Sequence, residues 1–416
     1  MLLALVTLAF AGPDPAYLRA SGPYREEGRW MVELAPDARL SGSVPRFPGH
    51  PEFARFRVMA TEPPVGAVVR AWRPFLAVPP PDTGDTAGEP TPDFRSQQTW
   101  LDADHGIAAD EATRFPGGDG NALTIADVEY GWESGHEDLA ATVGILAWGY
   151  DSMQYQYHGT SVLGELRATH NDFGVDGAVG AASLMVLSPW ADPDTYDVGA
   201  AVLAAIDLLG PGDVLLIEQQ GYVEGSYCPV EVDPGVFAAI QAATADGIVV
   251  IEPGGNGSQD LDDPKWDGWF DRSAQDSGAV LVGGGASPLS RDETRSWTNS
   301  GSSYGARVDV QGWYDSIVTS TNGDYEGAFA DLWYPGEDPL RAYTESFGGT
   351  SGASPMVASV ASITQGVRIA RAGGAWEPAD LRAALVSTGL AQPVEQSERI
   401  GPQPTLRSLL RVYGRP

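Results

Sequence analysis

Residues 213–251 read DVLLIEQQGYVEGSYCPVEVDPGVFAAIQAATADGIVVI. This stretch contains two short apolar runs, at 213–217 and 247–251, with a helical segment at 234–245 between them. Continuous apolar runs of this length are typical of strands that are buried on both faces of a parallel sheet. Parallel neighbours need a crossover connection, and the helical segment supplies one. The stretch therefore predicts a β-α-β unit.

The same alternation of strand and helix extends on both sides of this unit, from about residue 94 onward. Further apolar runs lie at 122–126 and 183–187, and a further helical segment lies at 198–209. We predict an α/β fold over residues 94–416, with a doubly wound parallel sheet covered by helices on both faces. Because ligands of such sheets bind at the carboxyl ends of the strands, functional side chains are expected directly after these runs.

Three shorter segments precede the predicted sheet domain. Residues 2–10 are apolar but too few to span a membrane, and residues 9–11 (AFA) resemble a signal-peptide cleavage site, so residues 1–11 are predicted to be a signal peptide. Residues 12–78 contain alternating runs that predict a small β-rich or α+β unit. Residues 79–93 are rich in proline, glycine, threonine and acidic residues, which predicts an exposed linker.

The charge and the cysteine content exclude several classes of protein. The chain has 56 acidic and 25 basic residues, a net charge of −31. Such a surface repels polyanions, so nucleic acid and anionic membranes are not expected as partners. The one cysteine, Cys228, excludes an internal disulfide and a cysteine-built metal site, and we expect it to be a small buried hydrophobic residue.

Three polar residues follow or begin predicted elements. Asp127 comes directly after the run at 122–126, His158 begins HGTSVLG, and Ser351 lies in GTSGASPMVA, where a helix is expected to start. A serine hydroxyl is a weak nucleophile that needs an adjacent base, and the base needs a carboxylate to orient it. A helix that begins at the serine also directs its positive end and its N–H groups toward a developing oxyanion.

These three segments resemble the signature blocks of the subtilisin-like serine peptidases, the subtilase family, in that family's order of Asp, His and Ser. The resemblance extends roughly over residues 94–416. It implies a serine endopeptidase with the catalytic triad Asp127, His158 and Ser351, and with residues 12–78 as a pro-region. It also implies that the Asn256 side chain joins the backbone N–H of Ser351 in an oxyanion hole.

The resemblance implies a substrate edge as well. Gln219, Gln220 and Gly221 follow the run at 213–217, where the family pairs its extended substrate with a strand, and Gln219 would make the first pocket more polar than usual. No cofactor is required by this chemistry and no metal ligands are assigned. Calcium is possible because family members often bind it, but the acidic loop at 260–263 has no recognisable ligand spacing.

One departure from the family's pattern concerns the acid. The family usually has Ser or Thr and then Gly after the aspartate, whereas this chain has Val128-Glu129. On a continued strand Glu129 would point to the same face as Asp127.

The sequence therefore predicts a secreted serine endopeptidase with a signal peptide, made as a zymogen, which cleaves polypeptides as a monomer and is free of the membrane after signal removal. The alternative is a catalytically silent subtilisin-like protein that binds peptides, suggested by Glu129 and Gln219. A third interpretation is a salt-adapted surface protein, suggested by the charge of −31 and the single lysine, Lys265.

Overall fold

The computed structural model describes residues 30–34, 38–39, 41, 43–46, 49–59, 68–72, 90–102, 104–141, 143, 146–223, 225–289, 301–323, 331–392 and 398–413. The predicted signal peptide and most of the predicted linker lie outside these residues. None of the helices in the described part of the chain is long and apolar enough to cross a membrane.

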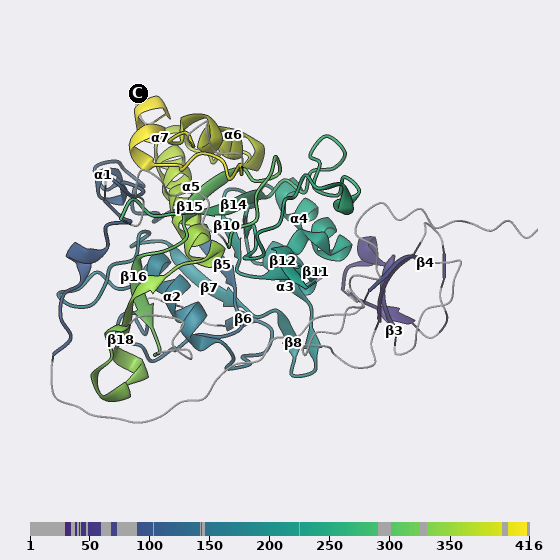
Figure 1. Ribbon diagram of the computed structural model, residues 1–416, viewed down its shortest axis with the longest axis horizontal. Coiled ribbons are helices and arrows are strands. Elements are labelled where there is room, and N and C mark those ends of the chain that lie inside the picture. Colours follow the sequence, from purple (N-terminus) through teal and green to yellow (C-terminus); the bar gives the residue numbers. More distant parts are fainter. Residues whose placement is uncertain are drawn as a thin grey trace, which may run out of the picture.

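A sheet of seven parallel strands forms the centre of the molecule (Figure 1). Its order is β15-β14-β13-β10-β5-β7-β6, so the chain starts near the middle and builds outward in both directions. The strands are β5 (Thr124–Val128), β6 (Leu146–Trp148), β7 (Ser183–Leu187), β10 (Val214–Ile217), β13 (Val249–Pro253), β14 (Val280–Gly285) and β15 (Val310–Trp313). Each neighbouring pair is parallel, which confirms the predicted sheet.

Helices cover both faces of this sheet, as predicted. The helices are α1 (Ala109–Ala112), α2 (Gln156–Arg167), α3 (Val198–Ile206), α4 (Pro234–Ala245), α5 (Thr350–Ala372), α6 (Pro378–Thr388) and α7 (Leu406–Tyr413). Alternate residues of β10 enter two different cores: Leu216 packs with α2 and α5 on one face, and Leu215 packs with α3 and α4 on the other. The C-terminal helices α6 and α7 add to the α5 side.

Local sequence signals fix where α3 and α4 begin. Asp197 accepts a hydrogen bond from the backbone N–H of Ala200, and Asp233 accepts hydrogen bonds from the N–H groups of Gly235 and Val236. Both are N-caps that satisfy N–H groups with no partner inside the helix. Pro234, at the first position of α4, favours the same start.

Smaller sheets flank the central one. An antiparallel sheet of β16 (Ile317–Thr321), β18 (Ala342–Phe347) and β17 (Asp331–Trp333) lies beside α2 and leads into α5. Two hairpins pair β8 (Trp190–Asp192) with β9 (Thr195–Tyr196) and β11 (Gln220–Val223) with β12 (Ser226–Pro229).

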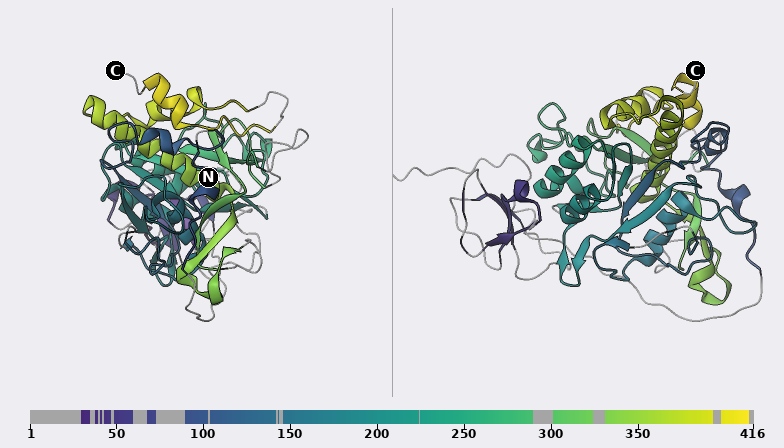
Figure 2. Two further views of the ribbon diagram at one scale, coloured as in Figure 1. Left: turned by 90° about the vertical axis from the view of Figure 1, so that its left-hand side faces the viewer. Right: turned by 180° about the vertical axis from the view of Figure 1, so that it is seen from behind.

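The N-terminal unit is a four-stranded antiparallel sheet in the order β2-β3-β1-β4 (Figures 1 and 2, purple). Its strands are β1 (Trp30–Leu34), β2 (Ser43–Pro45), β3 (Phe56–Met59) and β4 (Val68–Trp72). The side chains of Met31, Phe53 and Phe56 belong to the same hydrophobic core as α3 and α4. This unit therefore packs against the helical face of the central domain.

The strand near the predicted acid, Asp127, begins and ends two residues later than predicted. A strand was expected at 122–126, whereas β5 runs from Thr124 to Val128. Asp127 therefore lies inside the sheet, between Val186 of β7 and Leu216 of β10, and it does not follow the strand as predicted. The first acidic residue beyond the end of β5 is Glu129.

Candidate active site

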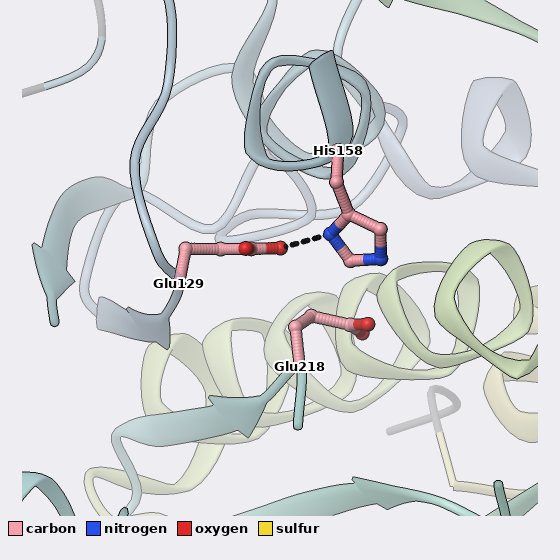
Figure 3. A group of neighbouring side chains, drawn as sticks. All are labelled: Glu129, His158 and Glu218. Carbon is pink, nitrogen blue, oxygen red and sulfur yellow. Dashed lines mark hydrogen bonds and ion pairs between the residues drawn. The ribbon is translucent and has the colours of Figure 1, made fainter. Parts of the chain in front are cut away.

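The candidate site lies where β5 and β10 end and where α2 and α5 begin. Glu129 follows β5, Glu218 follows β10, His158 is in the first turn of α2 and Ser351 is the second residue of α5. Figure 3 shows Glu129 and Glu218 directed toward the His158 imidazole. The carboxyl edge of the sheet thus carries the functional groups, as expected for this class of fold.

The histidine is held by Glu129. Its Nδ1 lies 2.7 Å from Oε1 of Glu129, whose side chain is only 1% exposed. The carboxylate accepts the Nδ1 proton, which leaves Nε2 as the nitrogen that can accept a proton. The imidazole also packs edge-on against Phe347, at a centroid distance of 5.8 Å. Because Phe347 ends β18, this contact ties the histidine to the segment that carries Ser351.

The assignment of Asp127 as the partner of His158 is wrong, because Glu129 occupies that place. Two residues advance a strand by about 6.6 Å, too far for Asp127 to substitute. Asp127 is fully buried, and neither of its carboxylate oxygens has a hydrogen-bond partner among the described residues. Burial raises the pKa of Asp127 well above its usual value, and the nearby charge of Glu129 raises it further.

A signal for Glu129 was present in the sequence. The family's carboxylate is followed two residues later by glycine, and Glu129-Tyr130-Gly131 has that spacing, whereas Asp127-Val128-Glu129 does not. The sequence therefore also allows a register in which Glu129, and not Asp127, is the carboxylate of the family's pattern.

Ser351 lies in the first turn of α5, so its N–H is among those with no intrahelical acceptor. The helix is preceded by Gly349, whose φ of +75° is in the region that favours glycine. The neighbouring Ser354 is fully buried and donates its hydroxyl proton to the carbonyl of Thr350. Ser354 is therefore engaged within the helix, whereas the Ser351 side chain interacts with Glu218 and lowers the pKa of that carboxyl.

Asn256 is held next to the start of α5. Its side-chain oxygen accepts hydrogen bonds from the N–H (2.9 Å) and the hydroxyl (3.0 Å) of Thr350. Its Nδ2 would lie 3.1 Å from a Cβ at position 349, so glycine there allows the amide to approach. Since the oxygen is engaged by Thr350, the amide N–H₂ group is the part that can serve a ligand beside Ser351.

The predicted substrate residues are engaged within the protein. Gln219 is 4% exposed, accepts a hydrogen bond from the Tyr196 hydroxyl (2.8 Å) and donates one to the carbonyl of Val128 (3.1 Å). Gln219 thus fixes the end of β5, one residue before Glu129. The Gln220 side chain accepts the backbone N–H of Asn256 at 2.9 Å, and Gly221 pairs with Cys228 across the β11–β12 hairpin.

Glu218 was not predicted as a site residue. It is 6% exposed, and a carboxylate oxygen of Glu218, a ring nitrogen of His158 and a carboxylate oxygen of Glu129 all lie within 4.8 Å of one another. Among the described residues, this is the group whose donor atoms are close enough together to hold a metal ion. The sequence offered one signal, the position of Glu218 directly after an apolar strand.

Other predicted features lie outside the site. Cys228 is fully buried, as expected, and burial raises the pKa of its thiol. His136 is buried and hydrogen-bonded to the carbonyl of Ala342, and His170 to that of Gly177. In the acidic loop, Asp260 and Asp263 accept hydrogen bonds from the backbone N–H groups of residues 262 and 265.

The protein thus belongs to the α/β class, with a serine, a histidine and a carboxylate at the carboxyl edge of its parallel sheet. Within this class, the model of the subtilase family matches residues 120–403. The chain therefore belongs to the subtilase family of serine peptidases, which confirms the predicted family. A comparison with curated protein sequences finds no match.

Solved structures agree with this fold. A protease from Pseudoalteromonas arctica PAMC 21717 superposes with a TM-score of 0.54 at 18% identity, covering 78% of this chain and 99% of that one. Fervidolysin from Fervidobacterium pennivorans, described as a keratinolytic enzyme related to subtilisin, gives a TM-score of 0.60 at 16% identity, covering 94% of this chain and 62% of that one. A psychrophilic subtilisin-like protease from Pseudoalteromonas sp. AS-11 gives 0.52 at 14% identity, covering 73% and 96%.

Proposed function

We propose that this protein is a serine endopeptidase that hydrolyses polypeptides through an acyl-enzyme, with Ser351 as nucleophile, His158 as base and Glu129 as the carboxylate that orients His158. The observation that carries the proposal is the 2.7 Å hydrogen bond between Glu129 and Nδ1 of His158. It fixes the tautomer that leaves Nε2 free of a proton, which a base for Ser351 requires.

The reaction follows from these positions. Nε2 of His158 takes the hydroxyl proton of Ser351 while Oγ forms a bond to the substrate carbonyl carbon and the carbonyl electron pair moves onto oxygen. The amide of Asn256 and the N–H of Ser351 donate hydrogen bonds to this oxyanion. When the intermediate collapses, the peptide C–N bond breaks and the imidazolium gives its proton to the leaving amine. Water then attacks the acyl carbon while Nε2 of His158 takes its proton. The ester bond to Ser351 breaks, and the imidazolium returns the proton to Oγ.

The catalytically silent alternative loses one of its reasons. It rested on the departure from the family's pattern at Val128-Glu129. Taking Glu129 as the acid restores the glycine two residues later, at Gly131, while Glu replaces Asp and Tyr130 replaces Ser or Thr. Its second reason was a polar pocket wall at Gln219, but this side chain is buried and hydrogen-bonded to the end of β5.

We also propose that residues 12–78 form a pro-region and that residues 1–11 direct export. Support for the pro-region comes from Arg46, which is 9% exposed and bridges the N-terminal unit to the central domain. Its guanidinium donates to Asp197 (2.7 Å) and to Asp233 (3.0 Å), the N-caps of α3 and α4. These ion pairs cross the boundary between the N-terminal unit and the central domain and hold the unit in place. The strands of the two parts belong to separate sheets.

The proposal is tested by labelling with a fluorophosphonate probe, which reacts with an activated serine. The wild-type protein is expected to be labelled and to hydrolyse casein, and Ser351→Ala is expected to lose both activities. Ser354→Ala is the matched control, because that serine is one turn away and already bonded within α5. Labelling that survives in Ser351→Ala would contradict the assignment.

A further inference from the structure

Glu218 is a second buried carboxyl beside His158, and one of its oxygens lies within 4.8 Å of an oxygen of Glu129 as well. Figure 3 shows its carboxyl group next to the imidazole edge that carries the second nitrogen, the one not bonded to Glu129. Nε2 of this histidine therefore lies on the side of the ring toward Glu218. The proposed mechanism gives Glu218 no role.

The described residues that act most strongly on Glu218 include no arginine or lysine to balance its charge. Neither of its carboxylate oxygens makes a hydrogen bond of ordinary geometry within the described part of the chain. The groups that act on it most strongly are carboxyls, namely Glu129 and Asp127 from the β5 segment and Glu165 from α2, together with the Ser351 side chain from α5. No arginine or lysine is among them. A deprotonated Glu218 would thus add a further buried negative charge, next to the Glu129 carboxylate and the oxyanion of the proposed reaction.

We propose that Glu218 is a fourth functional residue of this site, and that the enzyme is active only while Glu218 keeps its proton. This inference rests on the proposed function. It predicts that the peptidase loses activity at alkaline pH, where Glu218 gives up its proton. The chemical role is that of a neutral carboxylic acid placed beside a nucleophile and its base.

The two protonation states of Glu218 act differently on the reaction. With its proton, Glu218 adds no charge near the oxyanion and can donate its O–H as a hydrogen bond, and the Ser351 proton passes to Nε2 of His158. Without its proton, the carboxylate accepts the Ser351 O–H itself and competes with His158 for it. It also places a negative charge where negative charge develops in the transition state, which a preorganised site avoids.

Glu218 should keep its proton over a wider pH range than an exposed glutamate. Burial raises the pKa of Glu218 well above its usual value, and the neighbouring carboxyls Glu129 and Asp127 raise it further, while the Ser351 side chain lowers it. The loss of activity is therefore expected well above the range in which an exposed glutamate titrates. His158 must be without its second proton to act as base, and Glu218 must keep its own proton, so the rate profile should have two limbs.

The experiment measures the rate of fluorophosphonate labelling of the full-length protein as a function of pH. For the wild type we expect a bell-shaped profile that falls about ten-fold per pH unit beyond the alkaline midpoint. Glu218→Gln keeps the shape and a hydrogen-bond donor but cannot ionise. The labelling rate of this variant should reach a plateau and stay constant at alkaline pH.

The matched control is Glu165→Gln, another buried glutamate whose oxygens have no partner among the described residues and whose pKa is raised by burial. It is not in the group around His158, so Glu165→Gln should keep the alkaline limb. Because the charge of Glu165 raises the pKa of Glu218, the midpoint of this limb should be no higher than in the wild type. A wild-type profile that stays flat at alkaline pH, or an unchanged alkaline limb in Glu218→Gln, would overturn the inference while leaving the peptidase intact. Absence of any Ser351-dependent labelling would instead overturn the proposed function.

A second measurement does not depend on activity. Between the ordinary pKa of glutamate and the raised value, the unfolded chain releases the Glu218 proton and the folded protein keeps it, so the folded state loses stability as pH rises. Glu218→Gln lacks this contribution. Its stability relative to wild type, measured by urea unfolding, should therefore increase steadily from acidic to alkaline pH, and a constant difference would argue against a protonated Glu218.

Discussion

At the end of β5, two acidic residues that are two positions apart have different surroundings. Glu129 lies beyond the strand and hydrogen-bonds His158, whereas Asp127 lies inside the sheet with no partner among the described residues. Both residues lie on the same side of the strand because side chains alternate. The position at which the strand ends therefore decides which carboxylate reaches the histidine.

This difference can be tested with a pair of substitutions that preserve shape. Glu129→Gln is expected to lower kcat by about 10⁴, because an amide can stabilise the wrong tautomer of His158 and cannot stabilise the imidazolium. Asp127→Asn should leave kcat near the wild-type value. Casein hydrolysis by both variants provides the measurement, and a larger loss in Asp127→Asn would restore Asp127 as the acid.

At the scale of elements, a buried charge network joins the segment before α4 to the segment before β15. Arg307 is 2% exposed and donates to both oxygens of Glu231, at 2.7 and 2.9 Å, and to Asp309 at 3.0 Å. Glu231 and Asp309 are likewise buried. These ion pairs fix how two loops meet at the edge of the sheet.

Arg307→Met should therefore destabilise the fold by roughly 3–5 kcal/mol, because it leaves the buried Glu231 without its cation and leaves Asp309 with Arg272 alone. Urea unfolding at neutral pH measures the effect. Arg95→Met is the contrasting variant, since Arg95 pairs with Asp93 on the surface and should contribute little. Equal losses in the two variants would contradict the role given to burial.

The contact between the N-terminal unit and the helices α3 and α4 leads to a second prediction at this scale. Arg46→Ala, made in the Ser351→Ala background to prevent self-cleavage, leaves Asp197 and Asp233 without their shared cation. The N-terminal unit should then become sensitive to an added protease, while the central domain stays resistant.

Arg55→Ala is the control for this experiment, because Arg55 is half-exposed and pairs with Glu33 inside the N-terminal unit. Limited proteolysis followed by N-terminal sequencing compares the two variants. Identical cleavage of both would show that Arg46 does not hold the unit in place.

At the scale of the whole molecule, several buried carboxyls lack an adequate charge partner. Burial raises the pKa values of Asp127, Glu165, Glu218 and Glu252 well above their usual range. For Asp127, Glu218 and Glu252, neighbouring carboxyls raise the pKa further. The folded protein binds more protons than the unfolded chain at mildly acidic to neutral pH.

The free energy of unfolding should therefore be largest at mildly acidic pH and should fall as pH rises, because the folded state must either retain these protons or bury the charges. The net charge of −31 acts in the same direction through self-repulsion. Urea unfolding from about pH 4 to 9 tests this, and stability that increases steadily with pH would contradict it.

The sequence by itself determined the class of fold and most of the site. Apolar runs with helical segments between them predicted the parallel sheet, because burial on both faces demands such runs. His158 and Ser351 were singled out by their positions at expected helix starts, and the resemblance to the subtilase blocks then implied their roles and that of Asn256.

The tertiary structure showed which carboxylate contacts the histidine, for which the glycine spacing at Glu129–Gly131 was the only sequence signal, and where Glu218 lies. The strand β5 ends two residues later than the apolar run at 122–126, because its pairing with β7 and β10 continues through Val128. Glu218 is close to His158 because separate strands and helices converge at one edge of the sheet. Such proximity depends on contacts between residues far apart in the chain, which local sequence patterns do not encode.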